Sequence, residues 1–322
     1  MTEARLNDLS RKKWLKYSIS VWGDIKYDSH ERAFKKEHPA VFPLQIPLRF
    51  IEIFTHKGEW VLDPFSGLGT TLLACKMLAR NCYGIDISPE FTKIAAERVS
   101  QQTVLSGSPT QQIPICDDSR NLLKHVDKES IDFAVTSPPY WKILREQKTF
   151  LKREATPYTD LKGDLGNIGD YDEFVSGLVE VFSRVHEALR SSKFLVVDIM
   201  DIRIEDTFYP LHMDLIRKMS EIGFSLWDII VWDRHGEYNN LRAMAYASRF
   251  YVNKVHEYLL IFQNRERKSR ENQLGQNRKD LSTTRQMLLF PRQPFTRDEC
   301  ANCQLKKSAY CHRQCPYNVW RK

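Results

Sequence analysis

The sequence lacks the features that mark membrane, secreted and disordered proteins. No apolar stretch approaches the roughly 20 residues that span a bilayer, and the first residues, MTEARLNDLSRKKW, contain no apolar core of the signal-peptide type. We therefore expect a cytoplasmic protein with no membrane partner. Aromatic residues make up 11% of the chain. They provide enough apolar surface for a buried core, so the composition excludes a disordered protein.

The net charge, by contrast, excludes no class of binding partner, because basic and acidic residues are nearly balanced. The 322 residues carry a formal net charge of +7, and the isoelectric point is near 8.9. This excess is compatible with a polyanionic partner, although many soluble enzymes are equally basic. The length suits one large α/β domain or two smaller ones.

Short apolar runs alternate with helical patterns along the middle of the chain. This alternation predicts an α/β fold, a Rossmann-like sheet of seven strands with helices on both faces. The expected strands are residues 60–62, 83–87, 113–116, 131–135, 194–199, 224–232 and 258–262, and the expected helices are 72–78, 90–99, 174–189 and 211–222. No helical pattern separates the last two strands, so we expect a mixed sheet with an antiparallel pair at one edge.

Composition divides the chain into four parts. We expect an N-terminal extension at residues 1–37, the α/β domain at 38–263, a basic linker at 264–292 and a cysteine-rich tail at 293–322. The basic linker is either a solvated connection or an arm that contacts phosphates.

A glycine-rich turn follows the first expected strand. Its glycines permit a close approach of a ligand, and unpaired N–H groups at the start of the next helix would face that ligand. The turn lacks the Lys-Ser/Thr ending of a phosphate-binding loop, which argues against ATP or GTP. Its candidate ligand-binding residues are Asp63, Pro64, Phe65, Gly67, Gly69 and Thr70.

Acidic residues follow the next two expected strands. Asp86 stands about 20 residues after the turn, where a carboxylate accepts ribose hydroxyls. Asp117 and Asp118 end the third strand, and either one could face an adenine ring. The structural alternatives are that Asp63 only caps a turn and that Asp118 is solvated.

The segment Ser137-Pro138-Pro139-Tyr140 follows the strand at residues 131–135. Two prolines stiffen the backbone and leave carbonyl oxygens free to accept hydrogen bonds. The Ser137 hydroxyl and the Pro138 carbonyl could accept the two hydrogens of an exocyclic amine while Tyr140 stacks on the ring. The alternative is a purely structural Pro-Pro turn.

Together, the two motifs resemble those of the S-adenosylmethionine-dependent DNA amino-methyltransferases, which modify cytosine N4 or adenine N6. DPFSGLGT is similar to the cofactor motif of this family, and TSPPYW is similar to its catalytic motif. HPAVFP, at residues 38–43, resembles the segment that wraps the methionine part of the cofactor, and HEYLLIF resembles the last-strand signature. The resemblance covers roughly residues 14–263.

The resemblance implies direct methyl transfer from S-adenosylmethionine to the amine of a base flipped out of double-stranded DNA. It implies that Ser137, Pro138, Pro139 and Tyr140 form the catalytic site. The implied cofactor-binding residues are His38, Pro39, Asp63, Pro64, Phe65, Gly67, Gly69, Thr70, Asp86 and either Asp117 or Asp118. A cognate restriction endonuclease is a second partner that the resemblance allows.

Serine at the first position of the catalytic motif is more usual in cytosine-N4 enzymes, so we favour cytosine. The alternatives are adenine N6 in DNA, guanine N2 in RNA, and a nucleic-acid-binding protein with an inert core. The cofactor motif precedes the catalytic motif, an order that departs from many serine-type members. No long insert separates the motifs, so the candidate segments for DNA contact are 141–169, 233–254 and the C-terminal tail, of which the first two resemble loops at the strand ends around the active site.

Cysteines are few except at the end of the chain. Cys75, Cys82 and Cys116 stand in apolar settings, and we expect them to be buried. Cys300, Cys303, Cys311 and Cys315 crowd into the tail, where four thiolates would suit zinc or an iron–sulfur cluster. The alternative is four free cysteines.

Overall fold

The structure is a computed structural model that describes residues 5–27, 31, 42–102, 109–144, 159–237 and 247–265. Several predictions concern residues outside these ranges. They are the cofactor-binding role of His38 and Pro39, nearly all of the basic linker, and the metal-binding cysteines Cys300, Cys303, Cys311 and Cys315. These stay predictions.

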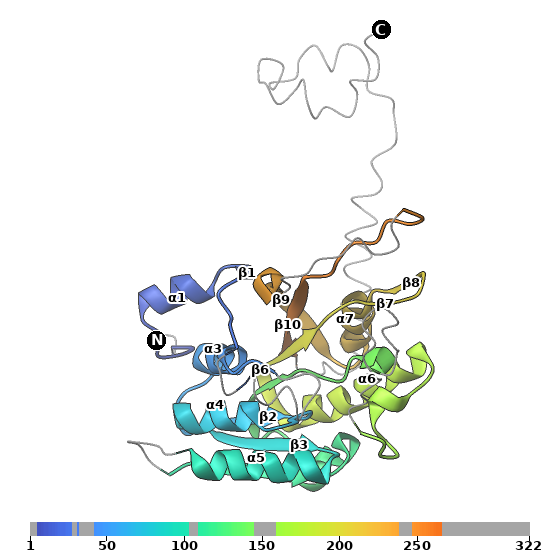
Figure 1. The fold of residues 1–322 in the computed structure, drawn as a ribbon. Coiled ribbons are helices and arrows are strands. Elements are labelled where there is room, and N and C mark those ends of the chain that lie inside the picture. Colours follow the sequence, from blue (N-terminus) through green and yellow to red (C-terminus); the bar gives the residue numbers. More distant parts are fainter. Residues whose placement is uncertain are drawn as a thin grey trace, which may run out of the picture. The chain divides into compact units, whose positions relative to one another are not determined.

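One eight-stranded sheet forms the centre of the described part (Figure 1). Its strand order is β1-β9-β10-β6-β5-β2-β3-β4. The strands are β1 (Val21–Trp22), β2 (Trp60–Asp63), β3 (Asn81–Asp86), β4 (Gln112–Cys116), β5 (Ile131–Thr136), β6 (Leu189–Ile199), β9 (Phe224–Asp233) and β10 (His256–Asn264). β10 runs antiparallel to both of its neighbours, and the other neighbouring pairs in this sheet are parallel.

The predicted α/β fold with a mixed sheet is confirmed, but the strand count and the edge are wrong. Each of the seven predicted strands is present, and β9 and β10 pair antiparallel as expected. The eighth strand, β1, pairs parallel with β9, so the antiparallel pair does not form the edge. With two residues, β1 is too short to show the alternation that identifies a strand.

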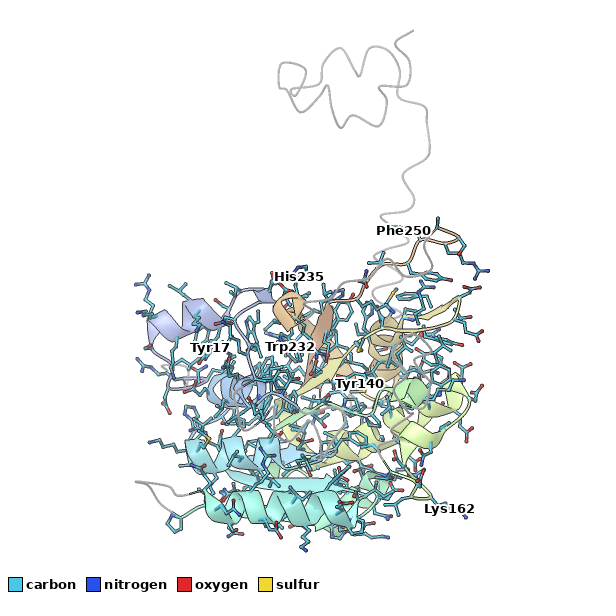
Figure 2. All side chains as sticks on the ribbon, in the orientation of Figure 1. Tyr17, Tyr140, Lys162, Trp232, His235 and Phe250 are labelled. Carbon is cyan, nitrogen blue, oxygen red and sulfur yellow. The ribbon has the colours of Figure 1, made fainter. Side chains whose placement is uncertain are left out.

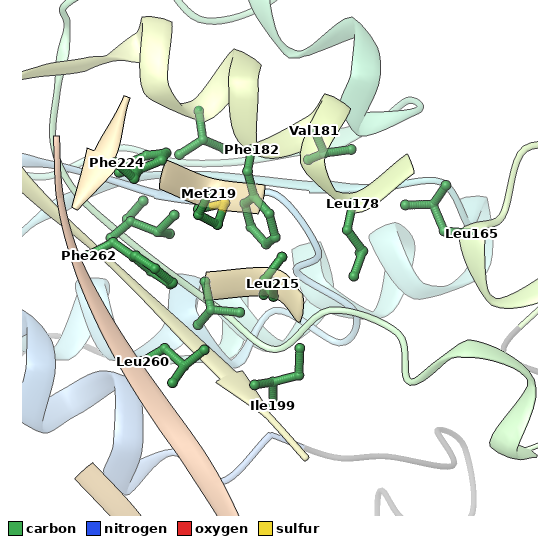
Figure 3. Close-up of a cluster of buried hydrophobic side chains, with 14 of the residues drawn as sticks. Leu165, Leu178, Val181, Phe182, Ile199, Leu215, Met219, Phe224, Leu260 and Phe262 are labelled. Atoms are coloured by element: carbon green, nitrogen blue, oxygen red, sulfur yellow. The ribbon is translucent and has the colours of Figure 1, made fainter. Parts of the chain in front are cut away.

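Helices cover both faces of the sheet. They are α1 (Arg11–Tyr17), α3 (Gln45–Phe54), α4 (Thr70–Leu78), α5 (Pro89–Gln101), α6 (Tyr171–Ala188) and α7 (Leu211–Glu221). Residues of α3, α4 and α5 share one buried cluster with one face of the sheet, and residues of α6 and α7 share another with the opposite face. Figure 3 shows the second cluster, where Phe182 of α6 and Met219 of α7 lie near Phe262 of β10. None of the described helices is long and apolar enough to cross a membrane.

The N-terminal segment takes part in the core. Trp22 of β1 is fully buried, its ring centroid lies 5.0 Å from that of Phe50 on α3, and its indole N–H donates to the carbonyl of Tyr17. Ile25 and Tyr27 are also buried. Part of the predicted extension thus completes one edge of the sheet.

Smaller elements surround the carboxyl ends of the strands. The hairpin of β7 (Ile202–Ile204) and β8 (Thr207–Tyr209) separates β6 from α7. The described residues also include four short 3-10 helices: η1 (Ser119–Lys124), η2 (Trp141–Leu144), η3 (Leu165–Asn167) and η4 (His235–Glu237). Among the cysteines, Cys75 and Cys82 are buried as predicted, but Cys116 is exposed because it ends the edge strand β4.

Candidate active site

A pocket opens where β2, β3, β4 and β5 end. Together with its open mouth and the solvent in it, the pocket occupies about 880 Å³. Gly67 of the glycine turn and Pro139 of the Pro-Pro segment both line it, although more than 70 residues separate them along the chain. The other predicted site residues that line it are Phe65, Thr70, Asp86, Asp118 and Ser137.

The backbone N–H groups of the glycine turn are bound within the protein. Gly67 donates to Asp86 Oδ2 at 2.8 Å, Ser66 donates to the Ile85 carbonyl, and Gly69 donates to the Ser66 carbonyl. These three residues precede α4, so the expectation that unpaired N–H groups at the start of that helix face a ligand stays a prediction. Because a carboxylate already accepts from the turn, an anionic phosphate there would be repelled.

The two glycines of the turn have different roles. Gly67 lines the pocket, whereas Gly69 is not among its lining residues. Gly69 has a φ of +75°, and a Cβ there would lie 2.7 Å from the Cβ of Ala95. Gly69 thus lets α4 pack closely against α5, which contains Ala95, and its predicted contact with the cofactor stays a prediction.

Asp63 lies buried beneath the pocket and does not line it, and neither does Pro64. Its carboxylate accepts from Thr71 Oγ1 at 2.5 Å, Thr136 Oγ1 at 2.7 Å and the N–H of Phe65 at 3.1 Å. Burial raises the pKa of Asp63 to about 6 against the opposing effect of these hydrogen bonds. The structural alternative fits best, since Asp63 ties the end of β2 to α4 and to the end of β5.

Two other carboxylates form part of the pocket wall. Asp86 Oδ1 accepts from the N–H of Ser88, and burial raises the Asp86 pKa to about 6. Asp118 caps η1 and binds the Arg120 guanidinium through both oxygens. Burial disfavours the charge of Asp118, but Arg120 outweighs it and lowers the pKa.

The structure separates the two adjacent aspartates that the sequence left open. Asp118 lines the pocket. Asp117 instead binds His125 Nε2 at 2.6 Å and Asn121 Nδ2 at 2.9 Å, and the His125 contact lowers its pKa to about 2. We therefore assign Asp118, and not Asp117, to the pocket.

One wall of the pocket was not predicted. Thr159, Gly163, Asp164 and Leu165 line it, and the sequence suggested only a DNA contact for this segment. Arg120 Nη2 donates to the Gly163 carbonyl at 3.1 Å, so the same guanidinium holds this wall and Asp118. No periodicity marks this segment in the sequence. Its local signal is the glycine at position 163, which adopts a φ of +105° in the structure.

The Pro-Pro segment presents Ser137 and Pro139 to the pocket, whereas Pro138 and Tyr140 are not among its lining residues. Tyr140 is only 8% exposed and lies among the ends of the central strands (Figure 2). Its hydroxyl donates to Glu257 Oε2 at 2.7 Å and lies 3.1 Å from Ser137 Oγ. Glu257, quoted above within the last-strand signature, had no predicted role of its own.

This arrangement suits a nucleoside beside a hydrogen-bond acceptor. Phe65, Ile87 and Phe91 offer apolar surface for an aromatic ring, and Asp86 and Asp118 offer carboxylates for hydroxyl and amine groups. Ser137 and Pro139 form the side of the pocket nearest the end of β5. Among the described residues no group of three or more histidines, cysteines and acids could hold a metal ion.

Comparison with known families adds an independent observation. Residues 2–97 and 131–320 match a family model described as DNA methylase, whose name specifies N6 and N4. The match includes both the glycine turn and the Pro-Pro segment and extends over well more than half of the chain.

Several named methyltransferases share parts of the sequence. The type II methyltransferase M.BglI of Bacillus subtilis is 36% identical over 94 residues, 29% of this chain and 26% of that protein. M.MthZI of Methanothermobacter thermautotrophicus is 31% identical over 98 residues, 30% and 27% of the two chains. M.HpaI of Haemophilus parainfluenzae is 28% identical over 137 residues, 37% and 44% of the two chains. The matched stretches thus span less than half of each relative.

Proposed function

This chain belongs to the N6/N4 family of DNA methylases, and from that premise we propose that it transfers a methyl group from S-adenosylmethionine to the exocyclic amine of a DNA base. The observation that carries the proposal is that Gly67 and Ser137 line one pocket. A cofactor held by the glycine turn would thereby meet a base amine held by the Pro-Pro segment.

The pocket residues fit a nucleoside cofactor that carries no phosphate. Asp86 would accept the ribose hydroxyls with the lone pairs left by its two backbone contacts, and Asp118 would accept the adenine amine. Phe65, Ile87 and Phe91 would contact the adenine ring. The negative charge at the glycine turn supports this choice over a nucleotide triphosphate.

Catalysis would consist mainly of positioning. S-adenosylmethionine supplies a sulfonium methyl group, an electrophile that needs no activation by the protein. Ser137 Oγ, which lines the pocket, and the carbonyl of Pro138, the next residue in the chain, would accept the two amine hydrogens and direct the nitrogen lone pair toward the methyl carbon. As the nitrogen–carbon bond forms, the carbon–sulfur bond would break, S-adenosylhomocysteine would leave, and the nitrogen would release one of its protons to solvent. The prolines keep this acceptor pair rigid because the φ angle of each is fixed by its ring.

We favour cytosine N4 as the target, on the strength of serine at the first position of the motif. Adenine N6 is the second candidate, since the family includes both specificities. The assay must also distinguish this function from two alternatives, which are methylation of guanine N2 in RNA and nucleic-acid binding by an inert core.

The partners would be double-stranded DNA and, by analogy with the type II relatives, a cognate restriction endonuclease. The segment 233–254 supports a DNA contact, because the side chain of Arg249 is 57% exposed and the neighbouring Phe250 is 91% exposed. We also propose that the tail cysteines bind a metal ion, since four thiols in one short segment match the ligand number of zinc.

The decisive experiment incubates the purified full chain with S-adenosylmethionine and mixed-sequence duplex DNA, then digests the DNA and analyses its nucleosides by mass spectrometry. We expect N4-methylcytosine in the wild type and a loss of at least about 100-fold in Ser137→Ala. N6-methyladenine would change the target base. No methylated amino base in DNA, with the cofactor bound, would overturn the proposed function.

A further inference from the structure

A chain of hydroxyl contacts runs from the pocket into the protein interior. Ser137 Oγ, at the pocket wall, lies 3.1 Å from the Tyr140 hydroxyl, and Tyr140 donates to Glu257 Oε2 at 2.7 Å. The three residues come from the Pro-Pro segment and from β10, so the contact also joins these two parts of the sheet edge. We propose that Glu257 fixes the direction of this chain and thereby makes Ser137 a hydrogen-bond acceptor toward the substrate amine.

The direction follows from counting protons. Each hydroxyl carries one proton, and an ionised carboxylate can only accept. The Tyr140 proton is therefore committed to Glu257, and the contact between the two hydroxyls must use the proton of Ser137. With its proton turned inward to Tyr140, Ser137 has only lone pairs left for the pocket.

The surroundings of Glu257 keep it ionised and in place. Its side chain is 4% exposed and forms an ion pair with Arg234 through Oε1, the oxygen that does not contact Tyr140. The guanidinium of Arg234 lies 4.7 Å from the ring centroid of Trp232, and the backbone N–H of Arg234 donates to the Val255 carbonyl at 2.8 Å. The nearby positive charge of Arg234 favours the charged form of this buried carboxylate, and removing either partner would leave an uncompensated buried charge.

This role makes an unusual prediction for Glu257→Gln. Arg234 would retain the amide oxygen at the Oε1 position, which turns the amide NH₂ toward Tyr140. Tyr140 would then accept from Gln, donate to Ser137, and leave the Ser137 proton pointing into the pocket. The isosteric change therefore reverses the chain and converts Ser137 from an acceptor into a donor.

The inference rests on the proposed function, and its test uses both turnover and binding by the full chain. Once the methylated sequence is known, the kcat is measured, and binding is compared between the natural duplex and one whose target carries a carbonyl in place of the amine. Uracil serves for a cytosine target and hypoxanthine for an adenine target. We expect the wild type to bind the carbonyl duplex at least about tenfold more weakly. In Glu257→Gln we expect kcat to fall about 100-fold and this preference to vanish or invert.

A matched control exists between helices α1 and α3, outside the pocket lining. Tyr17 donates to Glu52, which also binds Lys13, so the chain has a second tyrosine–glutamate–cation contact away from the pocket. Glu52→Gln should leave both kcat and the preference unchanged. Tyr140→Phe removes the link altogether, and the preference should weaken without inverting.

Two results would overturn the inference. The first is a Glu257→Gln protein with unchanged kcat, and the second is one whose kcat falls while its preference for the amine is retained, as expected of a merely structural contact. If Glu257→Gln does not fold, retention of the full preference by Tyr140→Phe has the same consequence. Failure of the proposed function is recognised separately, because the wild type would then methylate no DNA.

Discussion

At the scale of single residues, adjacent side chains of one type have different surroundings. Asp118 lines the pocket, and Asp117 binds His125. We expect Asp118→Asn to weaken binding of S-adenosylmethionine about tenfold or more, since a hydrogen bond to a charged group contributes about 1.5–3 kcal/mol. Titration calorimetry with the full chain measures this. Asp117→Asn is the matched control, and equal losses in the two variants would contradict the assignment.

Asp198 of β6 gives a prediction about pH. It is 1% exposed, and burial raises its pKa to about 8, which the positive charge of Arg234 only partly offsets. Because the folded state holds this proton more tightly than the unfolded state, Asp198 lowers the free energy of unfolding as pH rises from about 4 to about 8. Asp198→Asn should remove that part of the decline.

Chemical denaturation at several pH values from about 5 to about 9 tests this prediction, because these values cover most of the decline and extend past the raised pKa of Asp198. Asp228→Asn, at an exposed position on β9, serves as the control and should keep the wild-type profile. A profile of Asp198→Asn that is parallel to the wild type would show that Asp198 does not titrate in this range.

The sequence predicts where a residue lies in the fold better than it predicts where the side chain points. The carboxyl ends of parallel strands share one edge, so Asp86 and Ser137 could be expected near each other. Orientation is set by contacts from distant segments, such as Thr136 on Asp63 or Tyr140 on Glu257. Such contacts leave no local pattern, which is why Asp63 was expected at the ligand and Glu257 was not expected at all.

At the scale of elements, the close packing of α4 on α5 depends on Gly69. Alanine there would have an unfavourable positive φ, about 1–2 kcal/mol, and a Cβ within 2.7 Å of Ala95, which adds about 1–3 kcal/mol. Gly58 is a control because its φ is +84° and nothing lies within 4 Å of its added Cβ. We expect Gly69→Ala to lose more free energy of unfolding than Gly58→Ala in urea denaturation, and equal losses would contradict the clash.

A second element-scale feature is the projection formed by the β7–β8 hairpin and residues 247–255. Asp206, between β7 and β8, binds both Arg249 and the Tyr251 hydroxyl, which holds the two segments together. The projection is rooted beside the Pro-Pro segment, because the rings of Tyr209 and Trp141 lie 4.9 Å apart. Phe250 stands at its end, 91% exposed (Figure 2).

An exposed aromatic ring beside basic side chains suits stacking on a nucleobase. We expect Phe250→Ala to weaken binding of duplex DNA about tenfold, measured by fluorescence anisotropy at fixed salt, because stacking contributes about 1–3 kcal/mol per base. Trp227 on β9 is 59% exposed and lines a different pocket, so Trp227→Ala is the control. Similar affinities of Phe250→Ala and the wild type would exclude this contact.

Elements were predictable from the sequence in proportion to their length and regularity. The 18-residue helix α6 buries Phe174, Leu178, Val181, Phe182 and Val185, the face that helical spacing predicted. By contrast α1 has no buried residue, and β7 and β8 have three residues each. Elements that short are specified by the tertiary contacts they make, and no periodic pattern announces them.

At the scale of the whole molecule, the family match extends from residue 2 to residue 320 and includes the tail. The four tail cysteines are therefore part of a sequence that aligns with DNA methylases, and their predicted metal can be tested in the intact chain. We expect about one zinc ion per chain by inductively coupled plasma mass spectrometry. Visible absorbance would instead indicate an iron–sulfur cluster.

The test compares cysteine-to-serine variants within the tail with one outside the tail. Replacing Cys300 and Cys303 with serine removes two of four thiolates, so the bound metal should be lost, because thiolate ligands carry the affinity of such small sites. Cys116→Ser changes an exposed cysteine on β4 and should leave the metal content unchanged. A wild-type chain purified without metal, or a double variant that keeps it, would show that the tail thiols are free.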